Sequence, residues 1–465
     1  MIAQLRKLPP VVLLIVVFAL AVLPNLTVRS FVWEEGRIAE LARDITLRGD
    51  LLEPAIYGER YAEKPSLLSW IIAGVGYATG ELNEWSARLP TMVAVLVTAL
   101  LVLQLTRRFA SEAAALFAAG CFVFCPLVLR KLTIAEPDTL ITALIFGALV
   151  IWWWSRKRWI VRCLVCGALL ALAAMTKGPQ PLAYFALGIG GHLVVRKRWS
   201  EAADLILTLS IPAAAVVAWA VAVYRPGDPA VWLGYMRLTP RLDAAVYLIE
   251  RARFGGTMLL DLLPGILLVP FFWSQRESLD REKQELHELL FWFAGAATLV
   301  LFFWPGANTR YAMPAAPAVA VMAGLGFDHL WQRRRVLVRA AVIMLGGLIA
   351  YQLALVWIVM PMFAERFGAS RTAGLAIARA VGPSTSVFNV DGPDCNQLFY
   401  VSRPIRLVRR EEALQLQPPA WLVLAPVKLE WIKTHQPRYS LGQSVQTTSG
   451  QSLIAIEIGP VTVPE

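Results

Sequence analysis

The sequence predicts a polytopic, all-α membrane protein with a small α/β domain at its C-terminal end. Hydrophobic residues occupy 57% of the 465 positions and charged residues only 17%, whereas soluble domains carry about 25% charged residues. Many apolar runs reach the roughly 17–25 residues that a helix needs to cross a bilayer. Lys and Arg gather in short clusters between these runs, as they do in the cytoplasmic loops of membrane proteins.

Eleven apolar segments are candidates for membrane-spanning helices. They lie near residues 9–28, 89–106, 112–129, 138–154, 159–175, 181–195, 203–224, 257–273, 289–304, 312–331 and 338–360. Residues 159–195 must hold two of them, because one helix of that length would extend about 55 Å at 1.5 Å per residue. The break is predicted at the Thr-Lys-Gly-Pro-Gln-Pro stretch of 176–181, since Gly and Pro end helices.

The basic clusters predict which helix ends face the cytoplasm. They are Arg6-Lys7, Arg107-Arg108, Arg156-Lys157-Arg158, Arg196-Lys197-Arg198, the run from Arg276 to Lys283, and Arg333-Arg334-Arg335. With the N-terminus in the cytoplasm, every cluster falls on that side. The segments 30–88, 130–137, 225–256 and 305–311 then lie outside, as does Lys177. This topology explains the net charge of +11, so anionic membrane lipids are expected partners and nucleic acid is not.

The first outer segment is a charged loop that directly follows an apolar helix. Ile38, Leu41 and Ile45, with Leu47, have the spacing of one apolar face of a helix. Residues 67–78 are apolar but short for a crossing, which predicts a re-entrant or surface-lying helix. Charged groups beside a membrane are costly unless they do chemistry or bind a charged ligand. We therefore expect the active site in this loop.

The composition changes near the end of the last apolar segment and predicts two domains. Residues 1–362 form a transmembrane domain, and the less hydrophobic residues 363–465 form a small outer α/β domain. The expected strands are SVFNV (386–390), WLVLAP (421–426) and SLIAIEI (452–458), and the expected helices are TAGLAIARAV (372–381) and VKLEWIKTH (427–435). This domain is expected on the outer side of the membrane.

Acids and bases from separate parts of the sequence share the predicted outer side. They include Glu34, Glu35, Arg37, Glu40, Glu63, Lys64, Glu136, Asp138, Lys177, Arg310 and Tyr311. Taken singly, each has a structural explanation, such as a helix cap for Glu136 and Asp138 or a lipid-headgroup contact for Lys64 and Lys177. Taken together, carboxylates beside Lys and Arg at a membrane surface suit chemistry next to a bound phosphate.

Several of these residues lie in motifs that resemble the lipid-linked-sugar glycosyltransferases of the GT-C class. The matching motifs are Glu34-Glu35-Gly36-Arg37-Ile38-Ala39-Glu40, Gly49-Asp50, Lys64-Pro65, Glu136-Pro137-Asp138, Thr-Lys-Gly-Pro at 176–179 and Arg-Tyr-x-x-Pro at 310–314. They occur in the family's order over residues 10–330. The likeness is greater to bacterial aminoarabinose transferases, which modify lipid A, than to protein O-mannosyltransferases.

This resemblance implies a glycosyltransferase that moves a sugar, with inversion, from a polyprenyl-phosphate donor to an envelope acceptor. The acceptor would be lipid A or lipopolysaccharide, another glycolipid or a protein. The resemblance gives Glu34, with Glu35 beside it, the role of catalytic base or acceptor-orienting group. It assigns the donor phosphate to Arg37, Glu63, Lys64, Lys177, Arg310 and Tyr311, with Glu136, Asp138, Arg251 and Arg253 as further candidates.

This sequence departs from the family pattern at several positions. Glu34 replaces the usual Asp, and Ile38 replaces an aromatic residue. Some relatives bind a divalent metal through an acid of the Glu-Lys-Pro motif and a His of a later loop. The 225–256 loop has no His, so Glu63 is the only candidate ligand and no cofactor is predicted with certainty.

Two other functions remain open at this point. A transporter or flippase of lipid-linked sugars would place charges along a path that opens to both sides of the membrane. A non-catalytic scaffold for envelope assembly would tolerate neutralisation of both Glu34 and Glu35.

Overall fold

The computed structural model describes residues 9–236, 243–273, 280–304, 307–382, 385–392, 394–435, 437–447 and 452–460. Arg6, Lys7 and Arg276, which belong to predicted basic clusters, lie outside the described residues. The chain divides into two compact units. Unit 1 comprises Met1–Pro24, Ala62–Leu68 and Arg88–Trp357, and unit 2 comprises Asn25–Tyr61, Ser69–Ala87 and Ile358–Glu465.

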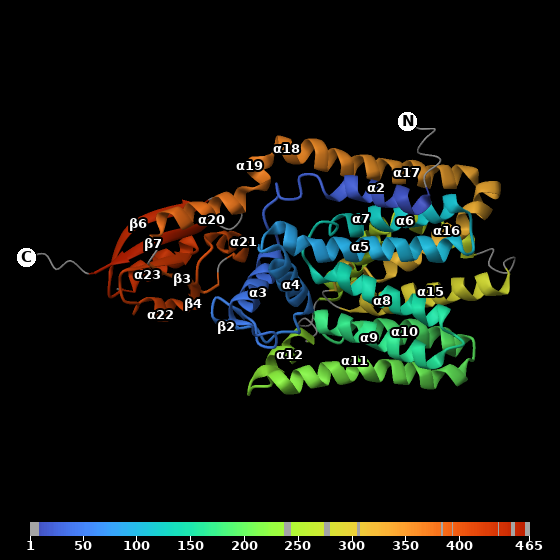
Figure 1. The fold of residues 1–465 in the computed structure, drawn as a ribbon, viewed down its shortest axis with the longest axis horizontal. Coiled ribbons are helices and arrows are strands. Elements are labelled where there is room, and N and C mark those ends of the chain that lie inside the picture. The colour runs from blue at the N-terminus through green and yellow to red at the C-terminus, as the bar shows by residue number, and fades with distance from the viewer. Residues whose placement is uncertain are drawn as a thin grey trace, which may run out of the picture. The chain divides into compact units, whose positions relative to one another are not determined.

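Unit 1 is built from helices, and its long helices run side by side (Figure 1). In chain order they are α2 (Pro10–Val22), α5 (Glu84–Arg107, which begins in unit 2), α6 (Glu112–Phe124), α7 (Pro126–Leu129), α8 (Pro137–Trp154), α9 (Trp159–Lys177), α10 (Gln180–Val195), η1 (Trp199–Glu201), α11 (Ala202–Val223), α12 (Asp228–Met236), α13 (Ala244–Asp261), η2 (Gly265–Leu267), α14 (Val269–Trp273), α15 (Arg281–Phe303), η4 (Thr309–Ala312), α16 (Ala315–Arg333) and α17 (Arg335–Ala354). The chain is thus mostly helical in this unit, as its apolar runs predict.

The apolar helices agree with the predicted class of membrane protein. Among the described residues, six helices are long and apolar enough to cross a membrane, or seven if a bent pair counts as one span. Each of the eleven predicted segments falls on helical structure. Six of them are the long helices, one is the bent pair, α16 carries another, and the shorter helices α2, α6 and α10 carry the rest.

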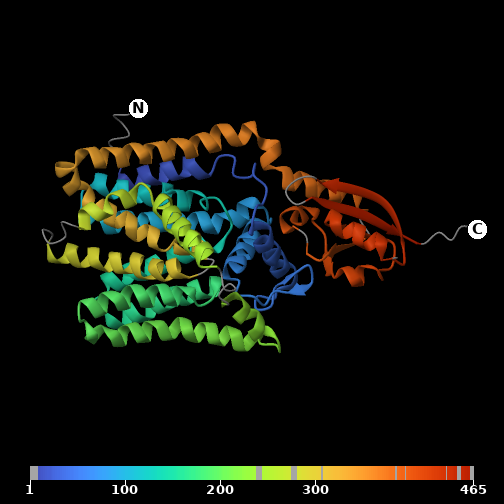
Figure 2. The ribbon, with the colours of Figure 1, turned by 180° about the vertical axis from the view of Figure 1, so that it is seen from behind.

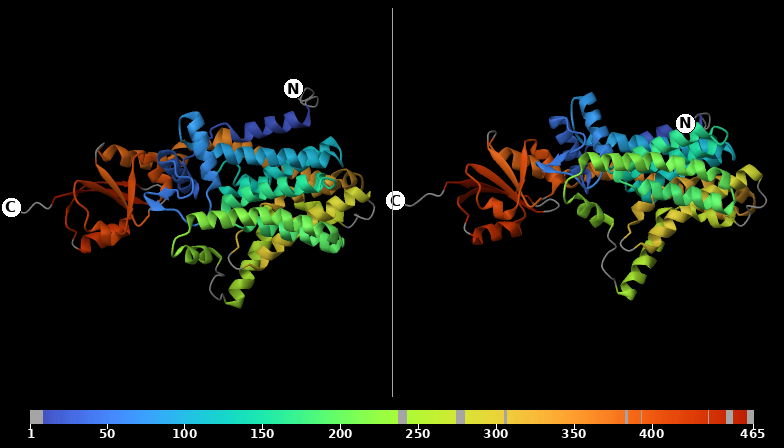
Figure 3. Two further views of the ribbon diagram at one scale, coloured as in Figure 1. Left: turned by 60° about the horizontal axis from the view of Figure 1, so that its bottom comes forward. Right: turned by 90° about the horizontal axis from the view of Figure 1, so that it is seen from below.

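The bent pair is where the structure differs from the prediction. Residues 257–273 were expected to form one straight crossing, but α13 and the following Gly265–Phe271 segment are bent by 99°. The break contains Pro264, which has no amide N–H to donate to a helix. Figure 3 shows α13 leaning away from the neighbouring helices of unit 1.

The predicted break between α9 and α10 is confirmed. Lys177 is the last residue of α9, and α10 begins at Gln180. Gly178 between them has φ +92°, a conformation that L side chains rarely adopt. The turn therefore depends on glycine. It ends α9 directly after Lys177 and so determines the position of the Lys177 backbone.

Unit 2 begins with the loop after α2. It contains α3 (Glu35–Arg48), the short antiparallel strands β1 (Ala55–Ile56) and β2 (Glu59–Arg60), and most of α4 (Leu67–Thr79). Leu41 and Ile45 are buried on one face of α3, as predicted. Leu47 is 74% exposed, so its assignment to that face was wrong. It follows Ile45 by two residues, which turns its side chain to the opposite side of the helix.

The C-terminal part of unit 2 is a five-stranded sheet with helices. The strands are β3 (Ser386–Val390), β4 (Ile405–Val408), β5 (Ala420–Leu424), β6 (Ser440–Thr447) and β7 (Leu453–Gly459), in the order β4-β3-β5-β7-β6. The first three in this order pair in parallel, and β7 pairs antiparallel with β5 and β6. The three predicted strands are confirmed, whereas β4 and β6 were missed.

Helices cover both faces of this twisted sheet (Figure 2). The chain enters through η5 (Leu355–Val359), α18 (Met360–Met362) and α19 (Ala364–Phe367), and the sheet is covered by α20 (Ala369–Ala380), α21 (Cys395–Leu398), η6 (Phe399–Val401), α22 (Arg410–Ala413) and α23 (Pro426–Thr434). One core packs Ile377 and Leu398 against Trp421, and the other packs Leu429 and Ile432 against Leu422. Both predicted helices, now α20 and α23, are confirmed.

Candidate active site

A cluster of charged side chains in unit 1 joins three separate stretches of the chain. Glu136 and Asp138 flank Pro137 at the start of α8, Lys177 ends α9, and Arg310 lies in η4. Glu136 forms an ion pair with Lys131 and lies 3.5 Å from an Arg310 guanidinium nitrogen. Asp138 accepts a hydrogen bond from Lys177. Three cations thus surround two carboxylates, which leaves the cluster with a net positive charge.

The two carboxylates of this cluster are buried. Glu136 is 2% exposed and Asp138 is 5% exposed. Glu136 occupies the N-cap position of α8, but its side chain makes no capping hydrogen bond. Glu136 Oε1 and Asp138 Oδ2 are buried with no hydrogen-bond partner among the described residues. The helix-cap explanation for Glu136 is therefore wrong, and its carboxylate is held by cations instead.

Both carboxylates affect the pKa of Arg310. Burial acts to lower the pKa of its guanidinium, but Asp138, Tyr311 and Glu136 outweigh burial, and the net effect raises the pKa. A guanidinium held in its charged form beside buried acids remains a permanent cation, and its fork geometry suits phosphate oxygens.

Tyr311 is fixed beside these cations. Its backbone oxygen accepts hydrogen bonds from the Tyr184 hydroxyl and from Gln180 Nε2, the latter at 3.3 Å. Lys177 Nζ lies 4.7 Å from the centre of its ring, and the Arg310 guanidinium lies 5.5 Å from it. The ring face thus adds a cation–π contact to each base, and α10 supplies the groups that hold η4 in place.

The segment that carries Glu63 and Lys64 also belongs to unit 1. Both side chains are half-buried and both make contacts. Trp232 Nε1 of α12 donates a hydrogen bond to the Ala62 carbonyl at 2.8 Å, which anchors the segment just before them.

The acid pair of the first loop lies in unit 2, and its two members differ in environment. Glu35 is fully buried, and its Oε2 accepts a hydrogen bond from the Val32 N–H at 3.1 Å and lies 4.0 Å from Arg29. The Glu34 side chain is 45% exposed and pairs with Arg37 at 3.4 Å. Arg37 also lies over the Tyr61 ring, 5.0 Å from its centre. Glu35 therefore holds the turn into α3, while Glu34 remains accessible.

Comparison with known proteins supports the family resemblance of these motifs. Residues 63–224 match the family described as dolichyl-phosphate-mannose-protein mannosyltransferase. The predicted family resemblance is confirmed. The matched segment contains Glu63, Lys64, Glu136, Asp138 and Lys177, and it ends before Arg310.

Comparison with individual proteins extends the likeness along the chain. The chain is similar to proteins named undecaprenyl phosphate-alpha-4-amino-4-deoxy-L-arabinose arabinosyl transferase. One, from Pectobacterium carotovorum, is 30% identical over 67% of this chain and 58% of its own length. Another, from Sodalis glossinidius, has the same name followed by the number 2. It is 31% identical over 42% of this chain and 37% of its own length. The chain thus spans less than two thirds of these relatives.

Solved structures show the same fold. ArnT from Cupriavidus metallidurans, crystallised with undecaprenyl phosphate, superposes with a TM-score of 0.75 over 98% of both chains at 18% identity. The oligosaccharyltransferase of Archaeoglobus fulgidus in its apo form gives 0.52 over 93% of this chain and 69% of its own, at 13% identity. At these identities the likeness concerns the fold, which includes the C-terminal part of the chain.

Two of the predicted further candidates lie in α13. Arg251 is 4% exposed, and its Nη1 donates to the carbonyls of Phe302 at 2.7 Å and Trp304 at 2.6 Å. It thereby satisfies carbonyls at the C-terminal end of α15, which have no partner within the helix. Arg253 is exposed. The guanidinium of Arg251 is therefore already bonded to the backbone.

For a metal, the described part of the chain offers no group of three or more His, Cys, Asp and Glu side chains close together. Glu63 remains the only ligand that the sequence motifs suggest.

Sequence reasoning missed Lys131. It lies in the predicted outer segment 130–137, five residues before Glu136, and is 8% exposed. The charge of Lys131 and its place in the outer segment could be seen in the sequence. Its contact with Glu136 could not, because the turn after α7 brings the ammonium group close to that carboxylate.

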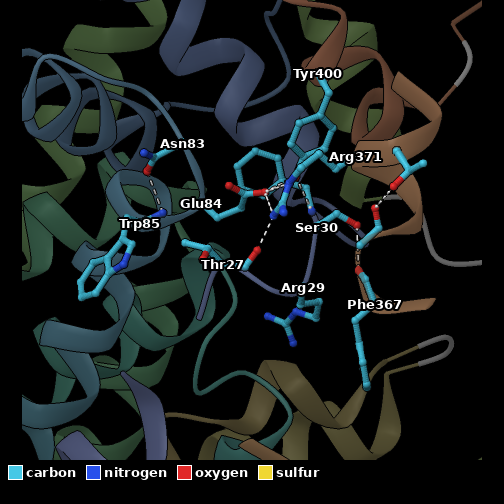
Figure 4. Close-up of polar contacts among 12 residues, drawn as sticks. Thr27, Arg29, Ser30, Asn83, Glu84, Trp85, Phe367, Arg371 and Tyr400 are labelled. Atoms are coloured by element: carbon cyan, nitrogen blue, oxygen red, sulfur yellow. Dashed lines mark hydrogen bonds and ion pairs between the residues drawn. The ribbon is translucent and has the colours of Figure 1, made fainter. Parts of the chain in front are cut away.

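A second buried network, in unit 2, was also missed. Glu84 Oε1 accepts a hydrogen bond from the Tyr400 hydroxyl at 2.6 Å and from Arg371 Nε at 3.1 Å (Figure 4). Arg371 also donates to the Thr27 carbonyl, and the Phe31 N–H donates to the Tyr400 hydroxyl at 2.9 Å. Burial, with Glu84 beside it, raises the pKa of Tyr400, which keeps its hydroxyl neutral. This Glu84 network ties the first loop to α20 and η6.

Proposed function

We propose that the chain is an integral-membrane glycosyltransferase that moves a sugar from a polyprenyl-phosphate donor to an acceptor of the bacterial envelope. The observation that carries this proposal is the cationic cluster of unit 1, where Lys131, Lys177 and Arg310 outnumber the buried carboxylates of Glu136 and Asp138. A phosphate group is the ligand that such a cluster favours. The names of the relatives suggest undecaprenyl phosphate carrying 4-amino-4-deoxy-L-arabinose as the donor. The family resemblance of the motifs suggests lipid A as the acceptor.

In this proposal the donor phosphate is the leaving group. An acceptor oxygen forms a bond to the anomeric carbon from the face opposite the phosphate, the bond from that carbon to the phosphate oxygen breaks, and the configuration inverts. Lys177 and Arg310, with Lys131 behind them, stabilise the charge that builds on the departing phosphate. The family motif adds Glu63, Lys64, Arg37 and Tyr311 to the donor-binding residues.

Glu34 is the proposed base. It takes the proton from an acceptor hydroxyl, or orients an acceptor phosphate that needs no deprotonation. Its accessibility supports this role, because a base must reach its substrate, whereas buried Glu35 is held by backbone and Arg29. The extra methylene of Glu relative to the family's Asp moves the carboxylate by about an ångström, and a displacement of that size affects rate.

The proposed topology has eleven crossings, with the N-terminus in the cytoplasm and the C-terminal domain in the periplasm. Residues 1–362 then form the transmembrane domain of an inner-membrane protein, with the outer loop 30–88, and residues 363–465 form the periplasmic domain. Every predicted crossing falls on helical structure, which supports the count.

The test is turnover by the purified protein with synthetic undecaprenyl phosphate-aminoarabinose and lipid A, followed by mass spectrometry. We expect Glu34→Gln to lower kcat by at least about 10²-fold while the protein still inserts and purifies. The control is Glu59→Gln, which neutralises an exposed carboxylate of the same loop. Full activity of Glu34→Gln would overturn the assignment of the base.

The same assay separates the alternative functions. A transporter would move the labelled donor across a vesicle membrane without any mass gain on an acceptor, and a scaffold would do neither. Comparing envelope lipids and glycans of cells with and without the gene identifies the acceptor class, because lipid A, another glycolipid and protein gain mass in different fractions.

A further inference from the structure

The backbone on either side of Glu34 and Glu35 is held by a single side chain of the C-terminal sheet domain. Asn396, in α21, accepts a hydrogen bond from the Gly36 N–H at 3.0 Å through its Oδ1. Its Nδ2 donates to the Trp33 carbonyl at 3.0 Å. The carboxamide thus spans the two acids and bonds the residue before them and the residue after them.

Asn396 is itself held rigidly. Asp394 Oδ1 accepts hydrogen bonds from the Asn396 backbone N–H at 2.9 Å and from its Nδ2 at 2.8 Å. The carboxamide therefore cannot rotate without losing bonds at both ends. Asp394, just before α21, thus orients the Asn396 carboxamide, and the carboxamide in turn holds the backbone at the start of α3.

The backbone that Asn396 holds is in an unfavourable conformation. Trp33 has φ +53°, a left-handed value that is rare for a bulky side chain. Such residues persist only where surrounding contacts determine the backbone, and they are concentrated at functional sites. The bond from Asn396 to the Trp33 carbonyl is such a contact, and Glu34 is the next residue.

Close packing adds a second restraint at the same point. A Cβ on Gly36 would lie 2.6 Å from the Asn396 backbone nitrogen and 2.7 Å from its Cα. The first turn of α3 therefore rests directly on α21. Other contacts between the loop and the C-terminal part lie further from Glu34 in the chain, among them the Glu84 network and the bond from Arg43 to the Phe399 carbonyl at 2.7 Å.

We propose that Asn396 is a positioning residue for Glu34, and that the C-terminal domain orients the catalytic carboxylate through it. This inference rests on the proposed role of Glu34. The proposal gives the C-terminal domain a function in the reaction, because α21 holds the backbone from which the Glu34 side chain and helix α3 extend.

The test compares two variants that loosen the same contact region. Asn396→Ala removes both bonds around the acid pair. Arg43→Gln removes the bond to the Phe399 carbonyl and the ion pair with Glu40, and it touches neither Trp33 nor Gly36. We expect both to lower the melting temperature. Only Asn396→Ala should lower kcat, by ten- to a hundredfold, with the donor KM unchanged. Gln415→Ala, an exposed amide of the same domain, is the neutral control.

A double-mutant cycle then ties the effect to the acid. Glu34→Asp keeps a carboxylate and should retain measurable turnover. If Asn396 acts through Glu34, the losses from Asn396→Ala and Glu34→Asp are not additive. Wild-type kcat in Asn396→Ala, an equal loss in Arg43→Gln, or strict additivity would each overturn the inference. Full activity in Glu34→Gln would overturn the proposed role of Glu34 as the base instead, so the two failures are distinguishable.

Discussion

At the scale of single residues, Lys177 has a structural role and a proposed binding role, and mutations can separate the two. It pairs with Asp138, whose carboxylate is 5% exposed, and it is a proposed ligand of the donor phosphate. Removing one partner of a buried ion pair costs about 3–5 kcal/mol, because the other charge stays buried. Removing both charges avoids that cost. Stability and donor binding should therefore respond differently to the two changes.

We predict that Lys177→Ala lowers the melting temperature and raises the donor KM. The double variant Lys177→Ala with Asp138→Asn should recover most of the stability but keep the raised KM, since no cation has returned to the phosphate. Thermal unfolding in detergent and steady-state kinetics measure the two effects. Lys157→Ala is the control, because it removes an exposed lysine. A double variant with normal KM would mean that Lys177 serves only to neutralise Asp138.

At this scale the sequence located most of the candidate charges but not their partners. Glu136 and Asp138 were singled out, yet a helix cap could not be distinguished from an ion pair, because both alternatives use the same residues beside Pro137. Lys131 decides the matter for Glu136, and its contact depends on the turn between α7 and α8. The contrast between buried Glu35 and accessible Glu34 likewise has no sequence signal, since the two acids are adjacent.

Small residues control how the elements of unit 1 pack. A Cβ on Gly324 of α16 would lie 2.7 Å from Ala118 Cβ in α6 and 2.7 Å from Thr106 Cγ2 in α5. Helices approach this closely in membranes only where side chains are small. Gly346 of α17 has open space around its Cβ position.

These two glycines give a matched prediction. Gly324→Ala should destabilise the protein by about 1–3 kcal/mol, because the added methyl group overpacks the contact with α6 and α5. Gly346→Ala should be neutral or slightly stabilising, since Ala favours a helix over Gly by up to about 1 kcal/mol. Thermal unfolding of the purified variants measures both. Equal stability of the two variants would contradict the close packing of α16.

Element boundaries could be predicted where a local signal exists. Gly178 and the prolines around it marked the break between α9 and α10, and the short runs rich in apolar residues marked strands β3, β5 and β7. β6 was missed because its side chains are mostly exposed and polar. The 99° bend after α13 was missed, although Pro264 lies in the break, because residues 257–273 are mostly apolar and together have the length of one membrane crossing.

At the scale of the whole molecule, the proposed topology makes a direct prediction. After replacement of the native cysteines, Gln415→Cys in the C-terminal domain and Lys157→Cys between α8 and α9 both introduce an exposed thiol. In intact spheroplasts, a membrane-impermeant maleimide should label position 415 at once and position 157 only after permeabilisation. The reverse pattern, or labelling of both positions from outside, would refute the orientation.

The sequence by itself determined the class of protein, the helix count to be tested and the chemistry of the outer loops. Hydropathy and charge act locally, so they can be read from consecutive residues, and the motifs carry the family resemblance. Only the tertiary structure decided which charges meet. Arg310 with Glu136, Glu84 with Arg371 and Tyr400, and Asn396 with the backbone around Glu34 are pairings across long stretches of chain. Such contacts depend on how elements fold back on one another, and no single segment encodes that.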